Sequence, residues 1–248
     1  MFWFKKKDIV VDLFTPFETV AEEYPIDYTR KFTPNWFKKG ANSYLVDDYI
    51  PHPTIKSCAG MLDLWTKGFI VPLWTDCKVN IKENGDYEWQ TADGRQTPVA
   101  HNSQQWDMFA DPSKYGHFKF NDCWSFSTKQ NVDWYWTEPY WHQALGLPYT
   151  TPPAILNSKY SNVALNIQLM LETDKKRVID FTAGQPMAQM IPLSDHNIKL
   201  KTHVVDHKDW GKYSNEAVGG GIGKFLNGFK TGQKIMKEKE KKCPFHFK

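Results

Sequence analysis

The 248-residue sequence predicts a mainly β protein, either an antiparallel β-sandwich or a jelly-roll-like barrel, with two or three short helices. Three observations support this class. Aromatic residues make up 15% of the chain, and large flat side chains favour sheets over helical bundles. Short segments alternate between apolar and polar residues, and turn-forming residues separate them. No segment repeats at a fixed period, so a solenoid or a propeller is not expected.

The N-terminal part predicts one strand and two short helices. Ile9–Phe14 is rich in β-branched and apolar residues and should form the first strand, which Pro16 ends. Apolar residues at helical spacing predict one or two helical turns within Phe17–Tyr24. Pro34 suits a first helical position and Gly40 suits the position after a helix end, so a second short helix is expected between them.

The longest predicted helix spans Thr54–Gly68. Thr54 is a suitable N-cap, Gly68 suits the position after the helix end, and the apolar residues between them form one stripe. The helix leads directly into Phe69–Trp74, a predicted strand that contains Pro72. Because proline cannot donate a backbone hydrogen bond, this strand should be an edge strand or a bulged strand.

The following region predicts a hairpin and then several further strands. Cys77–Ile81 and Tyr87–Thr91 flank an Asn-Gly turn, which is a strong hairpin signal. The sequence further predicts strands near Phe118–Phe126, over Asn131–Thr137, over Asn162–Glu172 as one long strand, and over Ile198–Thr202, with Pro148–Pro153 as a connection.

We expect Lys176–Ser194 to be the structural centre of the chain. Its first part should be a strand ending at Gly184, and Met187–Leu193 should be a second, buried strand. Gln185 and Gln189 would place amide groups in apolar surroundings, where they need hydrogen-bond partners. They either bond to neighbouring backbone or line a binding pocket.

Composition and charge restrict the compartment and the class of partner. The mean hydropathy is −0.58 and no apolar run is long enough to span a membrane. The first apolar residues precede the lysines, unlike a secretory signal, and the four cysteines have no zinc-type spacing. These features predict a protein kept in a reducing cytosol.

The net charge of +3 is unevenly distributed along the chain. Residues 1–210 are expected to form a single β-rich domain, and residues 211–248 a glycine-rich basic tail. The tail contains apolar residues at helical spacing, so an amphipathic helix should form when it docks on a partner. The predicted docking residues are Ile222, Phe225, Leu226, Phe229, Lys230 and Lys234. A solvated tail is the alternative, and nucleic acid ranks last among its partners.

Two groups of residues are candidates for binding. Trp134, Trp136, Tyr140 and Trp141 either form a stacking platform for a sugar, a proline-rich peptide or a nucleobase, or pack into the core. His203 and His207 are weak metal-ligand candidates, because their four-residue spacing suits a helix whereas the segment predicts a strand.

The sequence contains no signature of a catalytic family. The phosphate-binding loop, the dinucleotide-binding fingerprint and the Gly-x-Ser-x-Gly elbow are all missing. We therefore expect neither a cofactor nor a bound metal, and no enzyme class stands out.

Thr54–Trp74 and Phe181–Leu193, with Phe32–Lys38, resemble an uncharacterised protein family of tailed, T4-like marine bacteriophages. The resemblance covers about residues 9–207 and carries no assigned activity. It implies a phage protein located in the virion or the host cytoplasm, whose partners are other phage proteins or copies of itself. A structural or assembly protein that docks through its C-terminal tail is the first hypothesis. The first alternative is a jelly-roll enzyme, either metal-dependent or not. The second is a ligand-binding module with an aromatic stacking platform.

Overall fold

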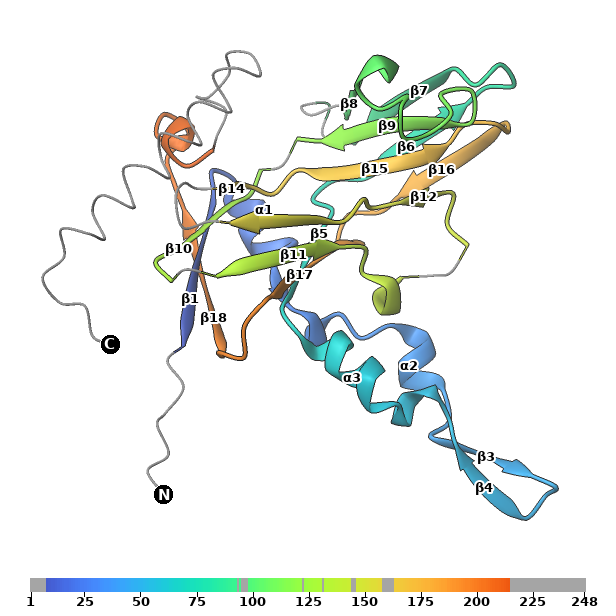
Figure 1. Ribbon diagram of the computed structural model, residues 1–248. Coiled ribbons are helices and arrows are strands. Elements are labelled where there is room, and N and C mark those ends of the chain that lie inside the picture. The colour runs from blue at the N-terminus through green and yellow to red at the C-terminus, as the bar shows by residue number, and fades with distance from the viewer. Residues whose placement is uncertain are drawn as a thin grey trace, which may run out of the picture.

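The computed structural model describes residues 8–214, except 93, 95–97, 122, 131, 144–145 and 158–162. The described part is mainly β, with three α-helices and several antiparallel sheets (Figure 1). Within these residues, no helix has the length and apolar character needed to cross a membrane. The expectation of a mainly β protein with two or three short helices is confirmed at this level.

Two sheets hold the N-terminal strand and the predicted central stretch. The first has the order β14 (Val163–Ala164), β10 (Ser125–Thr128), β1 (Ile9–Thr15) and β18 (Ile198–Val204). The second has the order β13 (Ala154–Asn157), β11 (Asp133–Thr137), β17 (Pro186–Pro192), β5 (Phe69–Pro72) and β2 (Asp27–Tyr28). Within the first sheet, β1 and β18 pair in parallel, which the sequence did not predict.

Two further sheets lie at one end of the body, and a projecting two-stranded hairpin lies at the opposite end (Figure 1). One has the order β12 (Tyr149–Thr150), β15 (Ile167–Glu172), β9 (Tyr115–Phe120) and β8 (Val99–Ala100). The other has the order β16 (Arg177–Phe181), β6 (Cys77–Ile81) and β7 (Tyr87–Thr91). Buried side chains from all four sheets form one continuous hydrophobic cluster, so the body has a single core.

A two-stranded hairpin projects from the body (Figure 1). Its strands are β3 (Ser43–Val46) and β4 (Ile50–Pro53), and they pair only with each other. The helices α2 (Asn35–Lys39) and α3 (Ala59–Thr66) lie between the hairpin and the sheets, whereas α1 (Glu18–Glu23) follows β1. We call residues 41–54 the arm.

The predicted helix Thr54–Gly68 is shorter than expected. Ile55–Ser57 forms a 3-10 turn, and the α-helix begins only after Cys58. Thr54 does not cap it, because its Oγ1 donates to the carbonyl oxygen of Ala41 at the base of the arm, at 2.8 Å. The C-terminal end of the helix is as predicted, because Gly68 follows the C-cap residue Lys67 and has the positive φ, +79°, that favours glycine after a helix end.

Two predicted continuous stretches are divided between sheets. Val163–Ala164 pairs with β10, and Ile167–Glu172 pairs with β9, so the predicted strand Asn162–Glu172 crosses from one sheet to another. In Lys176–Ser194, β16 is an edge strand of the three-stranded sheet, while β17 is the central strand of the five-stranded sheet. The register between β17 and β5 shifts between Pro186 and Ala188, so the ladder is irregular at Pro72, but the extra residue, Met187, lies in β17. β5 itself was predicted as an edge or bulged strand, and it is neither, because β2 pairs with Phe69 and Ile70 on its other side.

The packed body extends to Ser214, four residues beyond the expected domain boundary. The ring of Tyr213 stacks on Phe14 at a centroid distance of 4.5 Å, and Ser125 Oγ donates to the Tyr213 carbonyl oxygen. The predicted docking residues of the tail, Ile222 to Lys234, lie outside the described residues.

Candidate functional site

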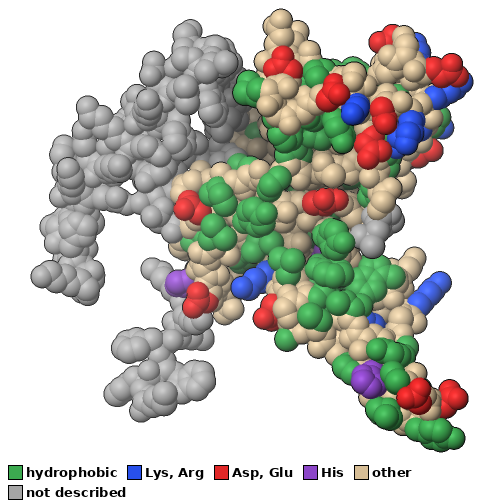
Figure 2. All heavy atoms as spheres, turned by 45° about the vertical axis from the view of Figure 1, so that its right-hand side comes forward, with side chains coloured by type: hydrophobic (Ala, Val, Ile, Leu, Met, Phe, Trp, Pro, Cys, Tyr) green, Lys and Arg blue, Asp and Glu red, His purple; other side chains and the backbone are tan. Residues whose placement is uncertain are grey.

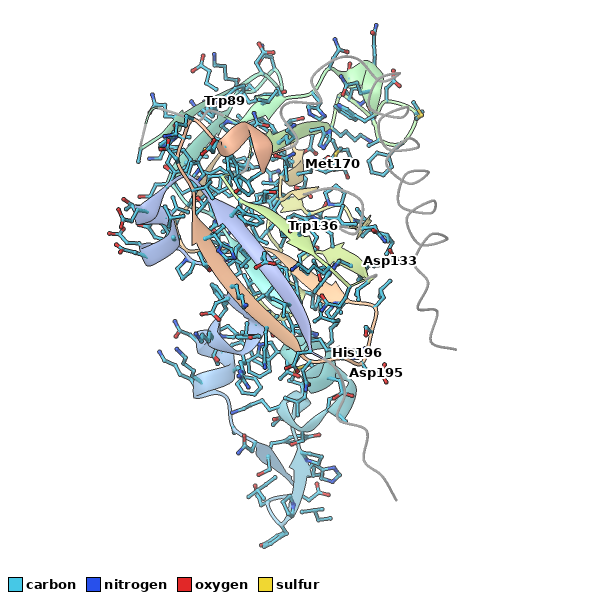
Figure 3. The ribbon with its side chains drawn as sticks, turned by 90° about the vertical axis from the view of Figure 1, so that its left-hand side faces the viewer. Trp89, Asp133, Trp136, Met170, Asp195 and His196 are labelled. Carbon is cyan, nitrogen blue, oxygen red and sulfur yellow. The ribbon has the colours of Figure 1, made fainter. Side chains whose placement is uncertain are left out.

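The predicted aromatic platform is wrong for its two central residues. Trp134 and Trp136 of β11 are buried in the core, with 0% and 4% of their surface exposed. Trp136 is labelled in Figure 3. Phe69 and Phe126 pack against the Trp134 ring at centroid distances of 5.5 and 5.9 Å. Because other side chains enclose both indoles, neither can reach a ligand. The alternative, core packing, is therefore correct for these two tryptophans.

Tyr140 and Trp141 lie outside the core, on the 3-10 turn Tyr140–His142. Tyr140 is about half exposed, whereas Trp141 is partly covered by Trp36 of α2, with ring centroids 6.2 Å apart. The Trp36 indole Nε1 donates to the Trp141 carbonyl oxygen at 3.2 Å. This turn therefore attaches the helical layer to the end of β11.

His142, on the same turn, is buried at that junction. Its Nδ1 lies 3.1 Å from Trp65 Nε1 of α3, which donates, and 2.9 Å from the carbonyl oxygen of Phe32. One ring nitrogen cannot accept from Trp65 and donate to Phe32 at the same time, so the two contacts compete. Burial lowers the pKa of His142, although the Phe32 carbonyl opposes this effect.

The two glutamines of the central stretch have protein partners. Gln189 Nε2 donates to the carbonyl oxygens of Leu64 and Lys67, both at 2.9 Å, and so satisfies the C-terminal end of α3. Gln185 Nε2 donates to the Tyr149 hydroxyl, and its Oε1 accepts from the backbone N–H of Thr182. Of the two alternatives, bonding to nearby protein groups is the one observed for both amides, and the Gln189 amide nitrogen is fully used by two backbone carbonyls.

The two metal-ligand candidates have structural contacts instead. His203 Nε2 lies 2.8 Å from Asp12 Oδ1, and its ring stacks on Phe14. The His207 ring packs edge-on against Phe17. Across the described part of the chain, no three His, Cys, Asp or Glu side chains converge as a metal site would require.

A serine and a histidine contact each other in the turn between β17 and β18, but the contact is local. Ser194 Oγ lies 2.7 Å from His196 Nδ1, and the same oxygen accepts from the His196 backbone N–H at 3.2 Å. This is the geometry of a serine turn, which organises the backbone between two strands. It does not indicate a nucleophile.

A cleft lies beside β12 and β15. Its volume is about 500 Å³, and Phe109, Tyr115, Tyr149 and Met170 form much of its wall. Burial raises the pKa of Tyr149 to about 12, so its hydroxyl is protonated at neutral pH. The wall is mainly apolar, with Asp111 and Glu172 at the cleft. Both carboxylates have cationic neighbours, Lys114 and Arg177 respectively.

The arm is the most unusual surface feature of the described chain. Its exposed apolar residues are Tyr44 at 55%, Leu45 at 60%, Tyr49 at 87% and Ile50 at 54%. Figure 2 shows hydrophobic side chains gathered along the arm, together with acidic groups. An isolated two-stranded hairpin is marginally stable in water, and clustered apolar groups on a projection mark an interaction site. The sequence did not predict this hairpin.

The arm is attached firmly at its base. The backbone N–H of Thr54 donates to the Asn42 carbonyl oxygen at 3.0 Å, and Lys56 Nζ donates to the Gly40 carbonyl oxygen at 2.7 Å. The Lys56 ammonium also lies 4.8 Å from the ring centre of Phe37, which packs on Trp65. These contacts connect the arm through α2 and α3 to the sheets. The arm is therefore a fixed projection that can present its side chains to another molecule.

Comparisons with known proteins add no relative. No family model, no curated protein and no solved structure matches the chain.

Proposed function

We propose that the protein is a non-enzymatic structural or assembly component of a bacteriophage, located in the virion or the host cytoplasm, and that it docks on neighbouring phage proteins or copies of itself. The observation that carries the docking role is the arm, which exposes four large apolar side chains on a fixed projection. A surface of this kind costs solubility unless a partner covers it. The resemblance of Thr54–Trp74 and Phe181–Leu193 to a phage protein family supports the phage assignment.

The fold proposed for this role is an antiparallel β-sandwich or jelly roll with an added arm. Four sheets that share one core support this architecture, since sandwiches bury one face of each sheet against the other. The parallel pairing of β1 with β18 is a departure from a purely antiparallel arrangement.

The C-terminal tail is proposed as a second docking element. Ile222, Phe225, Leu226 and Phe229 would face the partner, and the positive charge of Lys230 and Lys234 would favour an acidic surface. The tail and the arm can be tested separately, because they are far apart in the sequence.

A second candidate function is ligand binding, and the cleft beside β15 favours it. An apolar wall with one buried tyrosine hydroxyl suits a small molecule with a flat apolar part and one hydrogen-bonding group. This site replaces the aromatic platform of Trp134 and Trp136, which the core excludes.

The assembly role is tested by following the protein in purified phage particles. We expect the full-length chain to co-sediment with particles and to remain after a high-salt wash that removes loosely bound protein. Its absence from washed particles and from assembly intermediates would contradict the proposal.

Removal of the arm tests which element is responsible. Asn42 and Thr54 are hydrogen bonded across the base, so a two-residue Asn-Gly turn can replace residues 43–53 without moving α2 or α3. We expect this variant to fold and to bind particles less well than the wild type. A variant that lacks residues 215–248 provides the matched test of the tail.

A further inference from the structure

One edge of the arm has open backbone hydrogen-bonding groups. Thr54 bonds to Asn42, and bonded and non-bonded pairs alternate along an antiparallel ladder. The pairs Tyr44–His52 and Val46–Ile50 are therefore bonded within the arm. The N–H and C=O groups of Ser43 and Leu45 point outward from β3, where another strand can pair with them.

The other edge of the arm is closed by prolines. Pro51 lies opposite Leu45 and Pro53 lies opposite Ser43, so both prolines occupy the outward-facing positions of β4. A proline nitrogen carries no hydrogen, and prolines at such positions prevent a further strand from pairing. The arm can therefore add a strand beside β3 but not beside β4.

We propose that the β3 edge pairs with the β3 edge of a second copy of this chain, which gives an antiparallel four-stranded sheet with two-fold symmetry. Ser43 of each copy bonds to Leu45 of the other, and Tyr44 faces its own counterpart on the symmetry axis. Four backbone hydrogen bonds form in this register. The prolines of both β4 strands then lie on the outer edges, so the assembly ends at two copies.

Charge complementarity favours a second copy over an unrelated strand. Antiparallel pairing of the two β3 strands brings the tip of each arm, where Asp47 and Asp48 form the turn after β3, towards the base of the other arm. The Lys56 ammonium lies there, 2.7 Å from the Gly40 carbonyl oxygen. Asp47 and Asp48 of each tip therefore approach a cation of the other copy, and the two-fold axis forms this contact twice.

The same pairing covers exposed apolar side chains of β3. Tyr44 and Leu45 are 55% and 60% exposed, and in the paired sheet both lie next to the β3 strand of the other copy. This inference rests on the proposed docking role of the arm and names its partner.

The test is the mass of the full-length protein in solution, measured by sedimentation velocity. We expect the wild type to sediment at twice the chain mass of 28.9 kDa. Leu45→Pro removes one outward N–H and leaves the bonds within the arm in place, so it should weaken dimerisation at least about tenfold. Leu45→Val keeps the N–H and should remain dimeric. A monomeric wild type at about 100 µM, or a dimeric Leu45→Pro, would overturn the inference.

A disulfide tests the register. In a background of Cys58→Ser and Cys243→Ser, Tyr44→Cys places two thiols opposite each other on the two-fold axis. The expected Cα separation of about 4.5 Å permits a disulfide. Ser43→Cys is the matched control, since its two thiols lie about two residues apart along the strands. We expect mild oxidation to crosslink the first variant and not the second, and the reverse result would refute this register.

The outcomes separate this inference from the proposed function. A dimer that is absent from phage particles would contradict the assembly role and leave the inference of dimerisation intact. A monomer that binds particles through its arm would support the assembly role and contradict dimerisation.

Discussion

Gly68→Ala should destabilise the protein strongly, whereas Gly60→Ala in the same helix region should not. Gly68 connects α3 to β5 and has φ +79°, a conformation that costs an alanine about 1–2 kcal/mol. A Cβ at Gly68 would lie 1.7 Å from the carbonyl oxygen of Met190 and 2.8 Å from its carbonyl carbon. Both atoms are backbone atoms of β17, so rotation of a side chain cannot relieve the overlap.

The expected loss follows from these two terms. Relief of the overlap requires β5 to move away from β17, the central strand of the five-stranded sheet. Overpacking of this kind costs about 1–3 kcal/mol. Together with the backbone strain, the free energy of unfolding should fall by about 3–5 kcal/mol.

Gly60 provides the control because a Cβ there meets nothing within 4 Å. Alanine is the better helix former, so Gly60→Ala should raise the free energy of unfolding by about 0.5–1 kcal/mol. Urea denaturation followed by circular dichroism measures both values. A Gly68→Ala variant within about 1 kcal/mol of the wild type would refute the close approach of Gly68 to β17.

Two further predictions concern the junction between the helices and the sheets. Gln189→Leu removes both N–H donors to the Leu64 and Lys67 carbonyl oxygens, so the free energy of unfolding should fall by about 2–4 kcal/mol, as measured by urea denaturation. Gln90→Leu, at an exposed position of β7, is the control and should change it by less than about 0.5 kcal/mol. Equal effects of the two substitutions would contradict the buried role of Gln189. The second prediction is that the free energy of unfolding decreases as the pH falls below 6.5, because burial lowers the pKa values of His142, His101 and His117 from 6.5 in the folded state. Below pH 6.5 the unfolded chain binds more protons than the folded chain, so this stabilisation is complete above pH 6.5 and is lost as the pH falls towards the folded pKa values. Urea titrations between pH 4 and 8 give the free energy of unfolding at each pH, and its dependence on pH should be shallower for His142→Gln than for the wild type. An unchanged dependence would contradict a contribution from His142.

The local elements were predictable from the sequence. The hairpin of Cys77–Ile81 and Tyr87–Thr91 was placed correctly, because its pairing depends on an Asn-Gly turn and on residues within fifteen positions of each other. β1 and the end of α3 at Gly68 were also placed correctly, since Pro16 and Gly68 act on their immediate neighbours.

The arm was missed because its sequence argues against a strand. Pro51 and Pro53 ordinarily exclude a strand, and they are tolerated here only because their nitrogens face outward from an edge. The turn uses Asp47 and Asp48 at φ values of 51° and 61°, which glycine or asparagine would more commonly supply. Neither feature signals a hairpin without the ladder itself.

The candidate site was predictable only in part. The sequence offered two alternatives for Trp134 and Trp136, and only the tertiary packing, with Phe69 and Phe126 against the Trp134 ring, decided for the core. Gln189 needed a partner on any interpretation, but Leu64 and Lys67 lie more than 120 residues away in sequence. A partner at that separation is set by the fold.

The sequence by itself determined a mainly β chain, most strand positions and the turns between them, because periodicity, proline and glycine act within a few residues. Tertiary structure alone decided which sheet each strand joins, since alternation of period two looks the same in every sheet. It is for this reason that Asn162–Glu172 divides between two sheets while its inward face remains apolar. The tertiary structure likewise decided that Tyr44 and Leu45 are exposed, because no other strand of the described chain pairs with the arm that carries them.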